Sequence, residues 1–380
     1  MTAQTQTDVP PKPEVRIATF NVENLMARFD FDGRQHNEDR VLRLYDFDDE
    51  EEYKDAERAR MIASTDDQRQ HSALAIAETD ADIVCLQEVE NLETLEAFEY
   101  GYLYRMLGRG YRTKVWRKGN DKRGIDVALM ARETTKAGEP IEVVRTESHR
   151  TLSFGQAGLF EEELPGRIQH PNERVFRRDL LEVHLKVGDA PLTVYVSHFK
   201  AMGGSREGEN GERIDGRDWS MPVRLAEARA MRAVIEANHT PGHNWIVCAD
   251  LNDYSERIVL TGSQARPDYA PTADPSDAID TLMGDGFAHN VLADLPPLER
   301  WTLYHAAGPD VRHLCQLDYL LLSPALRDAN RDRRPTVVRG GQPYRTPMPR
   351  VTRTERYPRV GWDRPKASDH CPIAITVRLT

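Results

Sequence analysis

Residues 245–253 read Trp-Ile-Val-Cys-Ala-Asp-Leu-Asn-Asp. The first five are mostly apolar and rich in β-branched and aromatic types, and this composition predicts a buried strand. Asp250 and Asn252 follow at the carboxyl end of that strand. On an extended backbone, side chains two residues apart point to the same side, so these two could share a water, a phosphate or a hard cation. An Asx turn that only closes the strand is the structural alternative.

The composition is that of a soluble globular protein. Hydrophobic residues make up 39% and charged residues 30% of the 380 residues, and no apolar run is long enough to cross a bilayer. Residues 1–14 are polar, contain proline and lack an apolar core, so they predict a disordered lead-in and not a secretory signal. We therefore expect a cytoplasmic protein without a membrane span. Because no clear linker divides residues 15–380, a single domain is expected there.

The net charge and the cysteines narrow the class of protein. A net charge of -11 argues against a surface coated for nucleic-acid binding, although it is compatible with a local basic site. The cysteines lie in or beside apolar segments and lack the short paired spacing of a zinc site. Buried free thiols, and not a disulfide framework, are therefore expected at Cys85, Cys248, Cys315 and Cys371.

Two segments have an unusual density of charge. Residues 30–67 are rich in acidic side chains and predict a solvated insertion. Residues 327–366, the basic segment, hold twelve Arg and Lys residues against four Asp and Glu residues. This local excess of positive charge in an acidic chain indicates an anion-binding face, with a solvated basic loop as the alternative.

Polar clusters also end other predicted strands. Residues 15–20 alternate as a strand and are followed by Asn21, Glu23 and Asn24, for which a capping or turn role is the alternative. The apolar run before Glu88 predicts a second buried strand. A carboxylate at the edge of such a strand costs several kcal/mol unless it is paired or coordinated, so Glu88 is a candidate metal ligand.

Three later strands carry an acid or a histidine. A strong strand over residues 192–197 ends at His198, which a glycine-containing loop follows; a lone histidine is more often structural than catalytic. Asp126 begins another strand, where it could simply pair with Arg123. Asp318 comes early in a further strand, and an Asp-His pair precedes the last one. Many α/β enzymes assemble an active site from such strand ends.

Seven short motifs in this order resemble those of the endonuclease/exonuclease/phosphatase superfamily, the DNase I-like fold. They are Asn21-Val22-Glu23-Asn24, Gln87-Glu88, Arg123-Gly124-Ile125-Asp126, Ser197-His198, Asp250-Leu251-Asn252, Leu317-Asp318-Tyr319 and Ser368-Asp369-His370. The resemblance implies an α/β (α+β) fold, a four-layer sandwich of two packed, largely antiparallel or mixed β-sheets flanked by helices. It also implies a divalent cation, Mg2+ or Mn2+, with Ca2+ as a further candidate.

The resemblance assigns a role to each motif residue. Glu88 is the expected metal carboxylate, and Asn21, Glu23 and Asp369 are expected beside the metal or the phosphate. Asp250 is expected to orient or deprotonate the attacking water, and Asn252 and His370 are expected to hold the phosphate. Asp318 is expected to orient His370, while His198 is the expected second histidine, with Asp126 as its partner. The expected substrate-binding cations are Lys200, Arg123 and Arg178.

Three functions follow as hypotheses. The first is a metal-dependent phosphodiesterase, a nuclease whose basic segment guides the polyanion. The second is a hydrolase of small phosphoesters, such as a phospholipid head group or a nucleotide derivative, which the acidic balance favours slightly. The third is a catalytically silent binding module. Leu317-Asp318-Tyr319 stands where the inositol-phosphatase branch has Cys-Asp-Arg, so that branch is not expected. No pattern indicates an obligate protein partner, and a monomer is expected.

Overall fold

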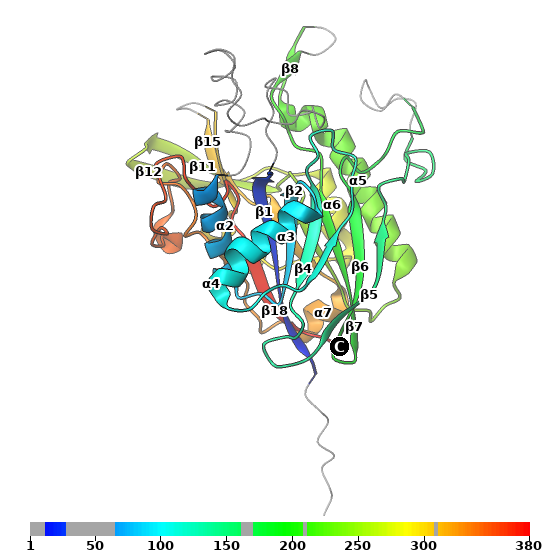
Figure 1. The fold of residues 1–380 in the computed structure, drawn as a ribbon. Coiled ribbons are helices and arrows are strands. Elements are labelled where there is room, and N and C mark those ends of the chain that lie inside the picture. The colour runs from blue at the N-terminus through cyan, green and yellow to red at the C-terminus, as the bar shows by residue number, and fades with distance from the viewer. Residues whose placement is uncertain (1–11, 28–64, 161–169, 208–210, 308–310) are drawn as a thin grey trace, which may run out of the picture.

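The computed structural model describes residues 12–27, 65–160, 170–207, 211–307 and 311–380. Two six-stranded sheets form its centre (Figure 1). The first sheet has the order β17 (Thr336–Val337), β18 (Ile373–Arg378), β1 (Glu14–Leu25), β2 (Ile83–Val89), β4 (Asp126–Ala131) and β3 (Thr113–Trp116). The second has the order β13 (His289–Asn290), β16 (Asp318–Leu322), β10 (Trp245–Asp250), β7 (Ala190–His198), β6 (Leu180–Val187) and β5 (Ile141–Ser148).

Both sheets are mixed. In the first, β1 runs parallel to β2 and antiparallel to β18. In the second, β10 runs parallel to β7 and antiparallel to β16. The other ladders of these two sheets are antiparallel. The expected largely antiparallel, mixed arrangement is therefore confirmed.

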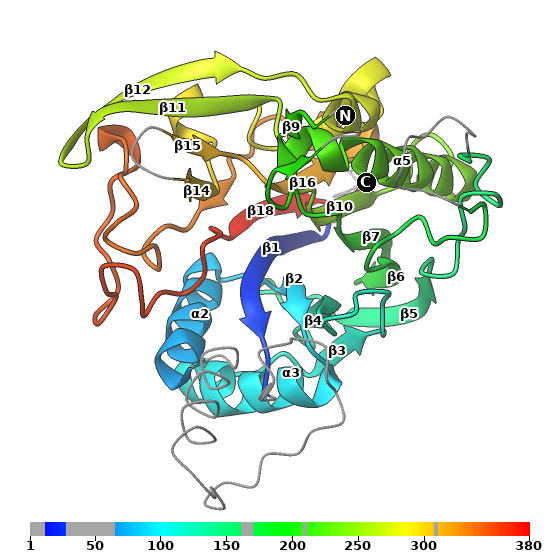
Figure 2. The ribbon, with the colours of Figure 1, turned by 90° about the horizontal axis from the view of Figure 1, so that it is seen from above.

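Helices cover both outer faces (Figure 2). The first sheet packs against α2 (Asp66–Thr79) and α3 (Leu92–Phe98), which continues through a π-helical turn (Glu99–Tyr104) into α4 (Arg105–Leu107). The second packs against α5 (Gly216–Asn238) and α6 (Asp277–Met283). A third apolar cluster fills the space between the sheets. The four layers predicted by the resemblance are thus present, and a short helix, α7 (Pro324–Ala329), follows β16.

The pleat of β10 explains where its polar end lies. Ile246 and Cys248 belong to the core between the sheets, whereas Val247 and Ala249 face the helices of the second sheet. Asp250 continues the inward set at the end of the strand, because side chains alternate with a period of two. Each buried aliphatic side chain stabilises the fold by about 1.5–3 kcal/mol, so this core fixes the strand ends firmly.

Asp253, just beyond β10, has a structural role. Its fully buried carboxylate accepts hydrogen bonds from Nε of Arg217 (2.9 Å), Nε of Arg224 (3.0 Å) and Oγ of Ser276 (2.9 Å). The two arginines belong to α5, and the serine caps α6. This network anchors both helices to the end of β10.

A smaller third sheet stands beside the sandwich. Its order is β12 (Arg266–Ala273), β11 (Glu256–Ser263), β15 (Arg312–Cys315) and β14 (Leu303–Ala306). The β11–β12 hairpin projects from the body of the molecule (Figure 2). No strand was predicted over these residues. A two-stranded ribbon, β8 (Arg206–Glu207) and β9 (Arg213–Ile214), precedes α5.

Several expectations concern the chain ends, the cysteines and the membrane. The predicted disordered lead-in lies outside the described residues except for residues 12–14, and β1 begins at Glu14. The charged insertion also lies outside them up to residue 64; Thr65 then caps α2.

All four cysteines are buried and free, as expected. Within the part of the chain that the structure covers, no helix is long and apolar enough to cross a membrane.

Candidate active site at the strand ends

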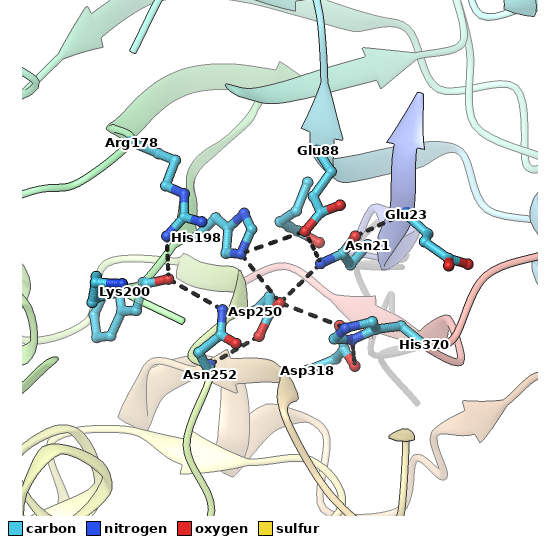
Figure 3. Close-up of polar contacts among 12 residues, drawn as sticks. Asn21, Glu23, Glu88, Arg178, His198, Lys200, Asp250, Asn252, Asp318 and His370 are labelled. Carbon is cyan, nitrogen blue, oxygen red and sulfur yellow. Dashed lines mark hydrogen bonds and ion pairs between the residues drawn. The ribbon is translucent and has the colours of Figure 1, made fainter. Parts of the chain in front are cut away.

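The inward polar residues of five strands meet at one end of the sandwich (Figure 3). In the second sheet, Asp250 lies opposite Asp318 on one side and opposite His198 on the other. The first sheet contributes Asn21 from β1 and Glu88 from β2, and His370 comes from the turn before β18. These side chains are distant in sequence. The two ladders of β10 align Asp318 and His198 with Asp250, and the packing of the two sheets adds the residues of the first sheet.

Asp250 is the centre of this cluster. Its carboxylate is 1% exposed; Oδ2 accepts a hydrogen bond from Nδ2 of Asn21 (2.9 Å) and lies 3.4 Å from Nε2 of His198 and 3.8 Å from Nε2 of His370. Burial raises the pKa of Asp250 to about 7, and the nearby carboxylate of Asp318 adds to the increase. A carboxyl group that titrates near neutrality is suited to take a proton from water.

Asp318 holds His370 in one orientation. Nδ1 of His370 lies 2.9 Å from Oδ2 of Asp318, as the resemblance implies. Burial alone would lower the pKa of His370, but the charges of Asp318 and Asp250 outweigh it and raise the pKa well above 6.5. His370 is therefore a cation at neutral pH, and its Nε2 is directed towards Asp250.

His198 is in the opposite protonation state. It is 2% exposed, and burial together with the charge of Arg178 lowers its pKa well below 6.5. The cluster therefore contains one neutral and one cationic imidazole on either side of the same carboxyl group. Groups with divergent pKa values in one place are typical of acid-base chemistry.

Glu88 reaches the cluster through a β-bulge. The register between β2 and β4 shifts around this residue, and its φ is 68°, a left-handed value that is uncommon for glutamate. Its Oε1 accepts a hydrogen bond from Nδ2 of Asn21 (3.3 Å), and Oε2 accepts one from the backbone N–H of Asn24 (2.9 Å). The bulge thus directs the carboxylate towards Asp250 and His198, where it is 15% exposed.

The Asx turn, which was the structural alternative for Asp250 and Asn252, is also present. Oδ1 of Asp250 accepts a hydrogen bond from the backbone N–H of Asn252 (2.8 Å), which forms an Asx turn, and Asn252 has a φ of 48°. The expectation of an extended backbone over these residues is therefore wrong. The turn nonetheless keeps Asn252 at the site, where its Nδ2 donates to the carbonyl of Phe199 (3.1 Å).

Glu23 and Asp369 lie at the edge of the cluster. The Glu23 carboxylate points away from Asp250 in Figure 3. Its Oε1 is 3.0 Å from Nζ of Lys366 and 2.6 Å from Nη2 of Arg364, and its Oε2 accepts the backbone N–H of Asp369 (3.1 Å). Burial and the charge of Asp369 raise the pKa of Glu23.

The predicted contact between Asp126 and His198 is not formed. In the described residues, Oδ1 of Asp126 and Nδ1 of His198 are both buried without a hydrogen-bond partner. The Asp126 carboxylate turns instead towards Gly119, whose backbone N–H it accepts and whose missing side chain leaves the space for it. Burial raises the pKa of Asp126 to about 7.

Two of the three candidate substrate-binding cations contact Asp121, which was not predicted as a site residue. Asp121 pairs with Nε of Arg178 (2.9 Å) and Nη2 of Arg123 (3.1 Å). Arg178 also donates to the carbonyl of Phe199 (2.8 Å), so it supports the loop that holds Asn252. Nζ of Lys200 donates to the carbonyl of Ala201 (3.3 Å), and burial lowers the pKa of Lys200.

Most of the basic segment is engaged within the protein. Eight of its twelve cations bond to a carboxylate or to a backbone carbonyl. They are Arg331, Arg333, Arg339, Arg345, Arg356, Arg359, Arg364 and Lys366. The segment therefore offers fewer cations to a polyanion than its composition predicts.

A cavity of about 540 Å³ lies beside Asn252 and was not predicted. Tyr254, His313 and His305 line it, with ring centroids 5.6 Å and 5.0 Å apart along this row. Burial, with the charge of His305, lowers the pKa of His313 to about 4, so its ring is neutral at physiological pH. The volume falls within the range of about 300–1,000 Å³ that is typical of small-ligand sites.

The residues of the cluster fit a hard divalent cation. Glu88 and Asp250 offer carboxylate oxygens, the donors that Mg2+ and Mn2+ prefer. Asn21 donates Nδ2 to both carboxylates, and its Oδ1 accepts the backbone N–H of Glu23, so it orients the carboxylates and does not direct an oxygen at the cluster. In the described part of the chain, Oδ1 of Asp318 is buried without a hydrogen-bond partner, which is a sign of uncompensated negative charge. Ligand atoms of Asp250, Asp318 and His370 lie within 4.8 Å of one another, but Oδ2 of Asp318 already bonds to Nδ1 of His370. Glu88 remains the principal ligand that the resemblance implies.

The sandwich of two mixed sheets with helices on both outer faces is the DNase I-like fold, which characterises a class of phosphoester hydrolases. The chain belongs to the Endonuclease/Exonuclease/phosphatase family, whose model matches residues 18–370. Members of this family are hydrolytic enzymes that act on phosphoester bonds. No curated protein matches the sequence.

Solved structures similar to this chain include three with low sequence identity. Truncated Caenorhabditis elegans TDP2 is 13% identical, with 96% of this chain and 97% of that chain covered and a TM-score of 0.46. The human Nocturnin catalytic domain with bound sulfate anion is 14% identical, with 98% and 97% covered and a TM-score of 0.49. An endonuclease/exonuclease/phosphatase family protein from Bacteroides thetaiotaomicron is 12% identical, with 97% and 96% covered and a TM-score of 0.49.

Proposed function

We propose that the protein is a divalent-metal-dependent phosphodiesterase that cleaves single-stranded nucleic acid by in-line attack of water. One observation carries this proposal: a buried carboxyl group with a pKa of about 7 lies between a neutral and a cationic imidazole, Asp250 between His198 and His370. Phosphodiester hydrolysis requires a group that takes a proton from water and groups that stabilise charge on the phosphoryl oxygens.

Each residue has a role in this proposal. Asp250 orients the water and takes its proton as the water oxygen bonds to phosphorus and the ester oxygen leaves. The His370 cation, held by Asp318, donates a hydrogen bond to a phosphoryl oxygen. Asn252 positions the phosphate, and Glu88, oriented by the hydrogen bond from Nδ2 of Asn21, would hold Mg2+ or Mn2+. A bound cation supplies positive charge that neutralises the phosphoryl group.

The cavity supports the choice of a nucleotide substrate. The exposed ring of His305, at the end of the row formed with His313 and Tyr254, can stack on a planar base, and Asn252 lines the same cavity. A base inside a duplex cannot enter such a cavity without leaving its stack, so a single strand is favoured. The engaged state of the basic segment also argues against a long duplex track.

Hydrolysis by the purified protein tests the proposal. Single-stranded DNA and RNA oligonucleotides, plasmid DNA and bis-p-nitrophenyl phosphate are incubated with EDTA, Mg2+ or Mn2+. We expect single strands to be cut only with metal, because the acidic cluster lacks sufficient positive charge without it. Cleavage of the small diester alone would establish the small-phosphoester alternative, and no cleavage under any metal would establish a silent binding module.

The stacking role of His305 predicts a selective loss of affinity. We expect His305→Ala to raise KM for a single-stranded oligonucleotide about 10-fold with little change in kcat, because a base stack contributes about 1–3 kcal/mol. His243→Ala, an exposed histidine after α5, is the matched control. The same substitution should have no effect on an oligonucleotide that is abasic at the seated position; an equal loss on both substrates would contradict stacking.

A further inference from the structure

Two groups of acidic side chains flank Asn21, and they differ in how their charge is balanced. The inner group consists of Glu88, Asp250 and Asp318, and the ring of His370 contacts the last two. The outer group consists of Glu23 and Asp369. The Glu23 carboxylate is turned away from Asp250 (Figure 3), whereas Oδ1 of Asp369 lies 4.0 Å from Nε2 of His370.

The outer group already has internal cations. Nζ of Lys366 lies 3.0 Å from Oε1 of Glu23, and the lysine side chain is only 4% exposed. Lys366 also interacts electrostatically with Asp369. Arg364 bonds to the same oxygen of Glu23 (2.6 Å) from a more exposed position, 55%. A buried ammonium is retained at such a place because buried charges need close opposite charges.

The remaining oxygen of Glu23 is engaged too. Oε2 accepts the backbone N–H of Asp369 (3.1 Å), and in the same turn Oγ of Ser368 donates to the carbonyl of Asn21 (2.7 Å) and accepts the N–H of His370 (3.0 Å). Both oxygens of Glu23 thus fix the turn that presents His370, and neither is directed at the inner group.

The contacts of Glu23 separate it from the inner group. Two basic side chains and a backbone N–H engage both of its oxygens. In the described residues, Oδ1 of Asp318 in the inner group is buried without a hydrogen-bond partner, so the inner group keeps a carboxylate oxygen that no donor satisfies. A second divalent ion at Glu23 would have to displace a buried ammonium.

We propose that the ammonium group of Lys366 takes the place of a second divalent cation, so that the protein binds one metal ion, at Glu88, and Glu23 is a positioning residue. The inference rests on the proposed metal dependence. It revises the expectation that Glu23 and Asp369 adjoin the metal, and it makes residue 366, at the end of the basic segment, part of the site's charge balance.

Mn2+ binding followed by electron paramagnetic resonance of the free ion tests the inference without any substrate. The full chain is expected to bind one Mn2+ ion, and Glu88→Gln is expected to bind none with useful affinity. Lys366→Met should bind a second ion, because it removes the buried ammonium that occupies Oε1 of Glu23. Arg364→Met, which removes the exposed cation and keeps the buried one, is the matched control and should still bind one.

Glu23→Gln provides a second measurement that does not depend on the folding of the lysine variant. We expect its Kd for Mn2+ to stay within about 3-fold of the unsubstituted protein, whereas loss of a ligand or of its direct support weakens metal binding by about 10–100-fold. Two ions on the unsubstituted protein, or a Kd raised more than about 10-fold in Glu23→Gln, would overturn the inference alone. No Mn2+ binding at all would overturn the metal dependence and the inference together.

Discussion

Asp250→Asn is expected to lower kcat at least about 10³-fold, because asparagine cannot accept a proton from the attacking water. The substitution preserves shape and can keep the hydrogen bond from the backbone N–H of Asn252, so the fold should remain. Hydrolysis of an oligonucleotide in Mg2+ or Mn2+ at saturating substrate measures the effect. Asp280→Asn, an exposed aspartate of α6, is the matched control and should retain full activity.

The same variant should not lose stability, and the direction follows from the pKa of Asp250. The folded pKa of about 7 exceeds the ordinary value of about 3.9, so between these pH values the folded state binds more protons than the unfolded state. The free energy of unfolding therefore falls as pH rises through this window, and the full cost of burying the ionised carboxylate is reached above pH 7. Asparagine does not ionise and avoids this cost. Thermal unfolding at pH 8 should therefore show Asp250→Asn to be at least as stable as the unsubstituted protein. An inactive variant that is also strongly destabilised would instead indicate a structural aspartate.

His370→Gln is expected to lower kcat by about 10²–10³-fold, the usual cost of removing one donor that stabilises charge in the transition state. Glutamine keeps a hydrogen-bond donor but not the positive charge that Asp318 and Asp250 maintain. Steady-state kinetics on the oligonucleotide measures it. His289→Gln, which changes a histidine of β13 outside the cluster, is the control and should keep the kcat of the unsubstituted protein. A loss of kcat of less than about 5-fold in His370→Gln would exclude a charge-stabilising role for His370.

Asp318→Asn should change the pH dependence in a defined direction. Activity that needs the His370 cation is lost as pH rises through the pKa of that imidazole. Without the Asp318 charge, the pKa of His370 falls, so the alkaline limb of the pH–kcat profile should move to lower pH. If kcat falls at every pH and the alkaline limb does not move, Asp318 does not control the protonation of His370.

The meeting of the strand ends could be predicted because it depends on periodicity. Cys248 and Asp250 point inward because their strand alternates, and the same rule places His198 at the end of β7. The seven motifs, in their order along the chain, then predicted the fold through their resemblance to a known superfamily. What decides this part of the structure is the apolar alternation, and that is visible in the sequence.

The local backbone could not be predicted in the same way. Glu88 and Asn252 both have a positive φ, and glutamate gives no sign of such a conformation. The choice of partner by Asp126 depends on how the loop between β3 and β4 folds back to bring Gly119 against its carboxylate. These features result from tertiary packing, which overrides the extended backbone that local residue preferences predict.

The walls of the cavity escaped prediction for another reason. The strands β14 and β15, which carry His305 and His313, have only four residues each, too few to show the period of two by which a strand is recognised. Other lining residues, such as Met202, Asn252 and Tyr254, lie in loops. The segments that line the cavity therefore have a weak sequence signal.

The pairing of β1 with β18 has a consequence for the order of events during synthesis. Glu14 pairs with Arg378 and Thr19 with Ile373, so the second neighbour of β1 arrives more than 350 residues after it. Asp369 and His370 immediately precede that late strand. A ribosome must therefore release nearly all of the described chain before the histidine can meet Asp318, because so distant a contact cannot form earlier. A growing chain thus has an incomplete set of site residues until the turn that carries His370 has been made.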